Sequence, residues 1–476
     1  MKPNLINGKW EATGHGVENI NPSDIMDVID VYAQAGRAET EAAIAAAAEA
    51  FPAWSLSTPQ QRHDILHRAG DEILTRCEEL ATLLAREEGK ILAEARGEVT
   101  RAGHIMLFFA GEALRQRGEL RESVRPGVQV DVTREPVGVI GVITPWNFPI
   151  AIPAWKIAPA LCHGNTVVFK PAELVPGCAW ALVDILHRAG MPPGVLNLVM
   201  GKGAVVGQTM LEDARVDAIT FTGSQVTGAR VAAASLPLMR KVQLEMGGKN
   251  PLVVLDDADL DVAVDCALDG AFYSTGQRCT ASSRLIVTRG IHDRFVAALA
   301  ERVSQLRVGP ALAENTQIGP VVDSIQLSQD IDYIATARRQ GGVLRAGGDT
   351  VRLQTEGYFL QPALITETHP DMQINREEVF GPVASVIAVE DYEAALAMAN
   401  DTPFGLSGGI CTTSLKYASD FKRKAQVGMV MVNLPTAGVD YHVPFGGRKA
   451  SSFGPREQGS HAAEFFTVVK TAYTRP

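Results

Sequence analysis

Residues 38–118 have the spacing of polar and apolar positions that packed helices show. Ala-rich runs such as AETEAAIAAAAEAF combine charged positions with apolar residues that recur every three or four positions. That spacing places the apolar side chains on one face of a helix, and alanine favours helical backbone. We therefore predict that this stretch is mainly helical.

The pattern changes to alternation after a turn at residues 125–127 that contains proline and glycine. Residues 128–143, VQVDVTREPVGVIGVI, alternate as a strand or hairpin does. The last residues, 464–476 (EFFTVVKTAYTRP), alternate in the same way. This terminal strand is separated along the chain from the other predicted strands, so we expect it to pair with another region of the chain or with another subunit.

Short β-rich runs alternate with helical segments between residues 137 and 255. The β-rich runs are VGVIGVI, GNTVVFK, GVLNLVM, DAITFTG and KVQLEM. This rhythm is typical of βαβ units and predicts a parallel, doubly wound sheet. A second stretch of the same kind covers residues 250–440, so the expected fold class is α/β.

Composition narrows the functional classes. A chain of 476 residues is too long for one ordinary core, so two or three packed units are expected. Hydrophobic residues make up 46% and charged residues 21%, a globular mixture that excludes a largely disordered or fibrous protein. The net charge of -10 is spread along the chain without a basic stripe. We therefore expect no nucleic acid and no membrane as partners.

The cysteines predict a reduced, cytoplasmic protein without a metal site. None of them forms a CxxC pair or has a histidine at metal-ligand spacing. The start of the chain, MKPNLINGKW, lacks an apolar signal segment, and no apolar run approaches the length of a membrane span. The six scattered cysteines are Cys77, Cys162, Cys178, Cys266, Cys279 and Cys411.

Two residues are candidates for nucleophile and base. Cys279 lies in STGQRCTAS, a small and polar segment in which a thiol can be accessible and ionisable. Glu245 ends the strand-like run KVQLE and precedes two glycines, the position where open α/β sheets bind ligands. A carboxylate there can act as a general base. Taken singly, each also fits a structural role, as a buried thiol or as a solvent-facing strand end.

Two further motifs lie at predicted strand ends. TPWNFP (144–149) holds Asn147 between prolines, which fix the backbone, so that its amide can donate to an oxyanion. FTGS (221–224) ends a strand with a glycine and opens a helix, whose free N–H groups suit a phosphate. Helix capping is the alternative in both cases. No GxGxxG fingerprint is present, since GKGAVVG (201–207) has one residue too many.

Taken together, these motifs resemble the aldehyde dehydrogenase superfamily over nearly the whole chain. NPSD, TPWNFP, KPAE, FTGS, EMGGK, GQRC, EEVFGP and PFGGRK occur in the family's order, and Glu245 precedes Cys279 by the usual 34 residues. The resemblance implies that Cys279 is the nucleophile and Glu245 the general base. It also implies that the Asn147 amide and the Cys279 N–H form the oxyanion hole. Lys156 and Glu457 match positions linked to proton relay in some relatives.

The resemblance further implies a nicotinamide cofactor. Glu173 is expected on the adenosine ribose, where its charge repels the 2′-phosphate of NADP, so NAD is preferred and NADP stays possible. The expected cofactor residues are Thr144, Trp146, Lys170, Glu173, Gly203, Gly207, Phe221, Gly223, Ser224, Glu378 and Phe380.

Fewer residues bear on the identity of the aldehyde than on that of the cofactor. Trp155 and Tyr273 stand where relatives acting on succinate semialdehyde carry arginines, which argues against that substrate. Residues 433–459 are similar to dehydrogenases of α-ketoglutaric semialdehyde (2,5-dioxopentanoate). Such a substrate requires a cation in the tunnel, and Arg278 is the candidate, with a structural ion pair as the alternative. The expected substrate residues are Phe148, Ile152, Trp155, Arg278, His442 and Phe445.

Other functions remain open at this stage. They are oxidation of an aromatic or aliphatic aldehyde, transfer of the acyl group to CoA, hydrolysis by a thiol, and a catalytically idle nucleotide-binding or structural protein. CoA-acylating relatives generally lack the general base that Glu245 provides here, and an idle protein would not need the intact set of catalytic residues.

The resemblance implies three structural parts. They are a Rossmann-like cofactor domain, a second α/β catalytic domain and a small β oligomerisation arm. The expected boundaries are 1–116 and 138–246 for the cofactor domain, 247–448 for the catalytic domain, and 117–137 with 449–476 for the arm. A homodimer or homotetramer is expected.

Overall fold

A computed structural model describes residues 1–12 and 15–476. Four helices occupy the first helical stretch, which confirms the prediction for residues 38–118. They are α1 (Arg37–Ser55), α2 (Pro59–Thr75), α3 (Cys77–Glu88) and α4 (Leu92–Ala113). Two strands precede them as a hairpin, β3 (Gly16–Asn21) and β4 (Asp24–Ala33).

The first large sheet has eight strands in the order β19-β11-β10-β7-β8-β9-β1-β2. Its central five strands are parallel, as the alternating pattern predicts. The chain runs from β7 outward to β9, then returns to the other side of β7 for β10 and β11, so the strand order reverses between β7 and β10. Open α/β sheets bind ligands at such a switch point. The strands are β1 (Asn4–Ile6), β2 (Lys9–Glu11), β7 (Val139–Ile143), β8 (Thr166–Lys170), β9 (Leu196–Leu198), β10 (Ala218–Gly223), β11 (Lys241–Met246) and β19 (Ser452–Phe453).

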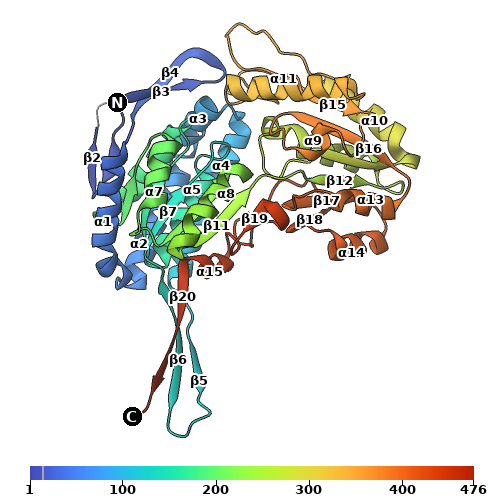
Figure 1. Ribbon diagram of the computed structural model, residues 1–476. Coiled ribbons are helices and arrows are strands. Elements are labelled where there is room, and N and C mark those ends of the chain that lie inside the picture. The colour runs from blue at the N-terminus through green and yellow to red at the C-terminus, as the bar shows by residue number, and fades with distance from the viewer. Residues whose placement is uncertain (13–14) are drawn as a thin grey trace.

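Helices cover both faces of this sheet, together with α1 to α4 (Figure 1). Every residue of α5 is buried, because this helix packs between α4 and the strands. The helices that connect the strands are α5 (Ala151–Cys162), α6 (Pro176–Arg188), α7 (Gln208–Glu212) and α8 (Gln225–Ser235).

The second large sheet has seven strands in the order β14-β15-β16-β13-β12-β17-β18. All its strand pairs are parallel except β14 with β15. The strands are β12 (Pro251–Val254), β13 (Arg284–Thr288), β14 (Val343–Ala346), β15 (Ala363–Thr366), β16 (Val383–Val389), β17 (Ser407–Cys411) and β18 (Met429–Val432). Its helices are α9 (Leu260–Phe272), α10 (Arg289–Ser304), α11 (Ser324–Arg339), α12 (Gln373–Arg376), α13 (Tyr392–Asn400) and α14 (Leu415–Lys424).

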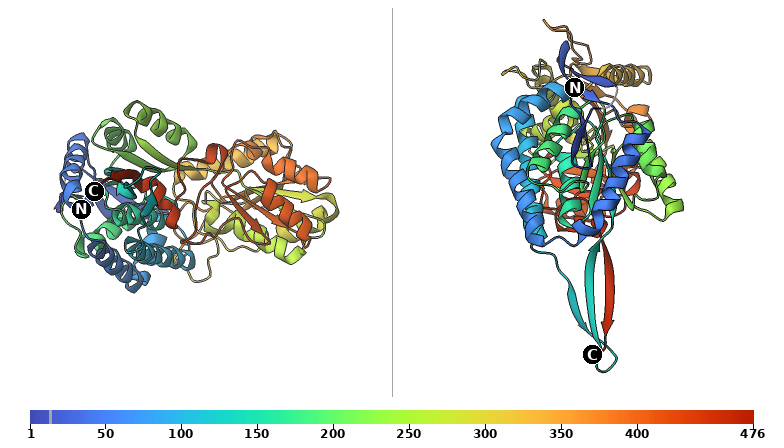
Figure 2. Two further views of the ribbon diagram at one scale, coloured as in Figure 1. Left: turned by 90° about the horizontal axis from the view of Figure 1, so that it is seen from below. Right: turned by 90° about the vertical axis from the view of Figure 1, so that its left-hand side faces the viewer.

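A narrow three-stranded sheet projects from the first α/β body, and the C-terminus lies at its far end (Figures 1 and 2). It consists of β5 (Glu119–Glu122), β6 (Gln129–Pro136) and β20 (Thr467–Thr474), with β6 in the middle. The pairing of β20 with β6 confirms that the terminal strand joins a distant region of the chain. Residues 452–453, inside the segment expected to belong to the arm, instead pair with β11 in the first sheet.

The two large sheets belong to two bodies that lie side by side (Figure 2). The chain passes from the first body to the second after β11 and returns after β18. On its return it forms β19 and the short helix α15 (Ala463–Phe466) before it enters the arm. In the described part of the chain, the helices lack the combination of length and apolar character that a membrane span needs.

Candidate active site

The candidate motifs meet at the carboxyl ends of β7, β10 and β11. The TPWNFP segment follows β7, Ser224 follows β10, and Glu245 lies near the end of β11. These strands are neighbours in the sheet, with Phe221 opposite Ile143 and Thr222 opposite Glu245. The topology thus brings together residues from three separate stretches of sequence, at the switch point of the sheet.

Cys279 comes from the second body and faces this edge. It follows α9 and a tight turn in which Ser274 and Thr275 have left-handed backbone, with φ of 51° and 55°. Gly276 has φ of 65° and packs so closely on Gly381 that a Cβ would collide with the carbonyl of that residue. The turn is therefore held in one conformation, and the partly exposed Cys279 lies just beyond it.

Asn147 contacts the segment that carries the cysteine. Its side-chain amide donates to the carbonyl oxygen of Gln277 at 2.9 Å, while Asn250 donates to the carbonyl of Cys279 at 2.8 Å. An amide group has two N–H donors, so Asn147 keeps one for a substrate oxygen. Asn147 is itself held by Lys90, whose ammonium donates to its backbone oxygen at 2.8 Å.

Carboxylates surround the Cys279 thiol. Burial raises its pKa, and the negative charges of Glu378 and Glu245 raise it further. The thiol is therefore held in its protonated form by the protein alone, and a cation brought into the site would favour the reactive thiolate.

Glu245 is buried and prone to hold a proton. Burial, followed by the nearby charge of Glu457, raises its pKa well above the ordinary value. The hydroxyl of Ser452, on β19, donates to its Oε2 at 2.5 Å. A carboxylate with a raised pKa is a stronger base than an ordinary one and is better able to accept a proton from water.

A buried polar chain continues from Glu245 into the first body. Lys156, on α5, forms an ion pair with Glu457 and donates to the hydroxyl of Thr220 at 2.8 Å. Thr220 in turn donates to Gln243 at 2.9 Å. The other carboxylate oxygen of Glu457, Oε2, is buried without a hydrogen-bond partner.

Several of the expected cofactor residues gather at the carboxyl end of β8. The ammonium of Lys170 lies 4.0 Å from the carboxylate of Glu173, which accepts a hydrogen bond from the Gly203 N–H at 2.7 Å. A Cβ at Gly203 or Gly207 would meet no atom closer than the Lys170 side chain, at 3.9 and 4.0 Å. The two glycines therefore keep side chains away from the lysine, which lies beside an acid that suits ribose hydroxyls.

The remaining cofactor candidates lie after β7, on and after β10, and in the second body. Ser224 caps α8 by accepting from the Thr227 N–H at 3.3 Å, which leaves other N–H groups of that helix terminus for a phosphate. The Trp146 and Phe380 rings meet edge to face at 5.3 Å. The hydroxyl of Thr144 is buried without a partner. The set fits a dinucleotide.

Glu378 is a partly buried residue beside Gly247 and Gly248, where the chain passes from the first body to the second. It accepts from the Gly248 N–H at 2.9 Å, and a Cβ at Gly247 would collide with its carboxylate. Burial raises the pKa of Glu378 to about 7. This group therefore changes charge near neutral pH, close to Cys279.

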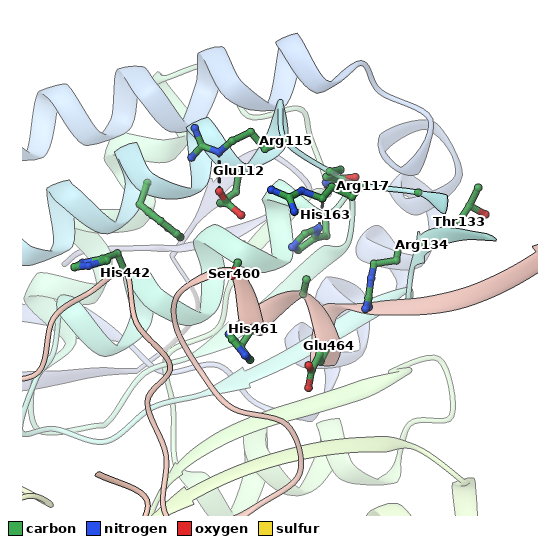
Figure 3. A pocket seen from close by; sticks show the side chains of 14 residues that line it. Glu112, Arg115, Arg117, Thr133, Arg134, His163, His442, Ser460, His461 and Glu464 are labelled. Carbon is green, nitrogen blue, oxygen red and sulfur yellow. Dashed lines mark hydrogen bonds and ion pairs between the residues drawn. The ribbon is translucent and has the colours of Figure 1, made fainter. Parts of the chain in front are cut away.

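The expected substrate residues divide between two places. The rings of Trp155 and Phe445 pack at 5.5 Å, and Phe148 lies under the Lys90 ammonium, which is 3.9 Å from the ring centroid. Ile152 is buried within the core of the first body. His442 is exposed and lines a cavity of about 700 Å³ at the base of the arm, with Arg134, His163 and His461 (Figure 3). None of the expected catalytic residues lines this cavity.

Arg278 has the arrangement of a structural ion pair. Its guanidinium lies 3.2 Å from Asp269 and 3.6 Å from Glu94. It lines a small pocket with Glu378 and Phe380, on the side of the expected cofactor residues. Its charge is already compensated by two carboxylates.

Sequence reasoning missed several polar residues that support the site. Lys90 and Glu98 form a buried ion pair at 2.7 Å beneath the TPWNFP turn, and Arg101 lies over the Trp155 ring. Glu98 and Arg101 could have been noticed as charged residues among the apolar positions of the helix at residues 92–113, whereas Lys90 precedes that helix. Ser452 and Gln458 were missed because short loop segments carry no periodic pattern.

Comparison with known proteins agrees with this geometry. Residues 10–472 match the aldehyde dehydrogenase family. The α-ketoglutaric semialdehyde dehydrogenase of Bacillus subtilis is 43% identical, across 99% of this chain and 98% of that protein. The α-ketoglutarate semialdehyde dehydrogenase of Haloferax volcanii is 42% identical, again across 99% and 98%. A crystal structure of Staphylococcus aureus betaine aldehyde dehydrogenase in complex with NAD+ matches with a TM-score of 0.97 and 33% identity, covering 100% of this chain and 95% of that one. The match over nearly the full length, joined to the arrangement of Asn147, Glu245 and Cys279, shows that this chain belongs to the aldehyde dehydrogenase family.

Proposed function

We propose that this protein oxidises α-ketoglutaric semialdehyde to α-ketoglutarate with NAD. The observation that carries the proposal is the meeting of Cys279, Asn147 and Glu245 at one sheet edge, with the Lys170, Glu173 and Gly203 cluster at the carboxyl end of β8 in the same sheet. The B. subtilis and H. volcanii relatives, which are named for this aldehyde, support the choice of substrate.

The residues divide the reaction into two stages. The Cys279 thiolate attacks the aldehyde carbon, and the oxygen that becomes negative is held by the free N–H of the Asn147 amide and by the Cys279 N–H. A nicotinamide held at this site would supply a hydride acceptor, and Cys279 would then carry the oxidised acyl group as a thioester. Glu245 then takes a proton from water, which attacks the thioester and releases the acid.

The proton that Glu245 accepts has a route away from the site. Glu457 is close enough for its charge to raise the pKa of Glu245, and it forms an ion pair with Lys156. We assign Glu457 and Lys156 to this proton relay. The buried oxygen of Glu457 that lacks a partner is a free acceptor for the proton.

NAD rather than NADP is the proposed cofactor. Glu173 is the only carboxylate within the cluster formed with Lys170 and Gly203 in the described residues. Its negative charge suits the two ribose hydroxyls of NAD and repels the 2′-phosphate of NADP. The NAD-bound betaine aldehyde dehydrogenase structure, with the same fold, supports this choice.

The projecting arm suggests an assembly of two or four subunits. Apolar side chains on it are exposed in the single chain, among them Leu120, Val469 and Tyr473. Such side chains on a narrow sheet are usually covered by a partner. We assign the arm to contact between subunits of a cytoplasmic enzyme.

The test follows cofactor reduction by absorbance. α-Ketoglutaric semialdehyde, succinate semialdehyde, benzaldehyde and hexanal are each supplied with NAD and with NADP. The proposal expects the highest kcat/KM for α-ketoglutaric semialdehyde with NAD, and no turnover by Cys279→Ala. Preference for another aldehyde refutes the substrate, and failure of every aldehyde to reduce either cofactor refutes the oxidation itself.

A further inference from the structure

Arg101 is a cation placed inside the first body, near the expected aldehyde tunnel. It lies on α4, and its guanidinium stands over the Trp155 ring, 5.6 Å from the centroid. One guanidinium nitrogen, Nη2, donates to the side-chain oxygen of Gln458 at 3.0 Å. Trp155 packs in turn on Phe445, so Arg101 borders the aromatic pair that is expected to line the tunnel.

The charge of Arg101 is not neutralised by a neighbour. Across residues 1–12 and 15–476, no carboxylate comes within ion-pair distance of its guanidinium, and its Nε is buried without any hydrogen-bond partner. Burial lowers the pKa of Arg101, and the more distant carboxylates of Glu98 and Asp440 oppose that effect. A partly buried cation with one neutral acceptor and an unused donor is stabilised when an anion joins it.

The nucleophile lies in the same region. The TPWNFP turn, whose Asn147 donates to Gln277 two residues before the nucleophile, leads into α5, and α5 carries the Trp155 ring that Arg101 covers. An aldehyde whose carbonyl carbon is at Cys279 and whose chain follows the Trp155–Phe445 pair extends towards Arg101. Arg278, although next to Cys279 in the sequence, is paired with Glu94 and Asp269 and has no such vacancy.

We propose that Arg101 binds the carboxylate of the substrate, through guanidinium N–H groups that Gln458 does not use. This inference rests on the proposed function and deepens it, because it names the group that selects a carboxylate-bearing aldehyde. Arginine presents its donors in a planar fork that matches a carboxylate. Gln458 and Trp155 hold the fork in place from two sides.

The test compares a charged and a neutral aldehyde in Arg101→Gln. The expected result is that kcat/KM for α-ketoglutaric semialdehyde, relative to hexanal, falls by about 10- to 100-fold, as for a lost charge-assisted hydrogen bond. The change is expected mainly in KM, because the group binds substrate far from the reacting carbon. Arg101→Lys keeps a point charge without the fork and is expected to give a smaller fall.

Arg96→Gln is the matched control. Arg96 lies on the same helix but is exposed and paired with Glu78 at the surface, so its substitution leaves the ratio unchanged. Thermal unfolding of each variant reports whether it folds. If Arg101→Gln does not fold, the inhibition of hexanal oxidation by added glutarate is measured in the wild type and in Arg101→Lys. Glutarate is expected to inhibit the lysine variant more weakly.

Two results would overturn the assignment. In the first, the wild type prefers the semialdehyde and Arg101→Gln has the same ratio of kcat/KM for the semialdehyde to kcat/KM for hexanal. This result would leave the proposed function intact. In the second, this ratio falls in Arg278→Gln but not in Arg101→Gln, and the substrate carboxylate would then be bound by Arg278. A wild type that prefers hexanal would refute the proposed substrate itself, which separates that failure from the failure of Arg101.

Discussion

Replacing Lys90 with methionine tests whether the buried charges beneath the TPWNFP turn position Asn147. The Lys90 ammonium lies 2.7 Å from Glu98 and 2.8 Å from the backbone oxygen of Asn147. Glu98 also accepts from the N–H groups of Ile150 and Ala151 at the start of α5, at 3.1 and 3.2 Å. One ion pair thus connects α4 to both the turn and the helix that follows it.

The expected loss of stability follows from burial. The side chains of Lys90 and Glu98 are each only 1% exposed, so Lys90→Met leaves a buried carboxylate without its main counter-charge. Removing one partner of such a pair costs about 3–5 kcal/mol. The Lys90→Met/Glu98→Gln variant removes both charges of this pair, while the oxygen of the introduced amide can still accept from the two N–H groups. Glu88, 3.9 Å from the Lys90 ammonium, has a pKa raised by burial to about 8 and can stay protonated. The double variant is therefore expected to recover most of that loss.

The measurement is urea-induced unfolding of the wild type, both single variants and the double variant at one protein concentration. Activity is measured in parallel, and Lys90→Met is expected to lower kcat, because Asn147 loses its backbone anchor. The loss should be smaller than the fall of about 10²- to 10³-fold that removal of an oxyanion donor causes in Asn147→Ala. Equal stability of Lys90→Met and the wild type, or a double variant less stable than Lys90→Met, would refute the reasoning.

Three further predictions concern single groups. Glu245→Gln should form the thioester but release the acid slowly. Rapid mixing should therefore show a burst of cofactor reduction followed by a low steady rate. An equal loss of the burst and of the steady rate would contradict the role of Glu245 as base. Glu173→Ser should raise kcat/KM with NADP relative to NAD, measured by absorbance with the same aldehyde, and an unchanged ratio would contradict the ribose assignment. Burial raises the pKa of Asp330 to about 8 from 3.8, so the folded state binds its proton more tightly than the unfolded state does. Stability is therefore lost as pH rises between these values, and Asp330→Asn should raise the melting temperature at pH 9 more than at pH 4. An equal shift at both pH values would contradict this assignment.

Much of the fold could be predicted because periodicity is a local property. The helical spacing of residues 38–118 corresponds to α1 to α4, and the alternation from residue 137 corresponds to the parallel sheet. The order of strands around the switch point places the TPWNFP, FTGS and EMGGK motifs together. Each motif could therefore be found in the sequence before its neighbours in space were known.

The partners of buried charges could not be predicted in this way. The sequence indicates Arg278 as the cation nearest the nucleophile, yet Glu94 on α4 and Asp269 on α9 neutralise it. Arg101 is far from Cys279 in the sequence and has no motif around it. Only the crossing of α4 over α5 places it at Trp155. The same limit applies to β19, because a two-residue strand is too short to show alternation.

The position of the C-terminus has a practical consequence for work with this enzyme. Pro476 lies two residues beyond the end of β20, at the tip of the projecting arm, while the N-terminus lies at the opposite end of the molecule (Figure 1). An affinity tag or fluorescent protein fused after Pro476 would add bulk to the surface assigned to subunit contact. A fusion before Met1 would leave that surface free, so purification and labelling should use the N-terminal end.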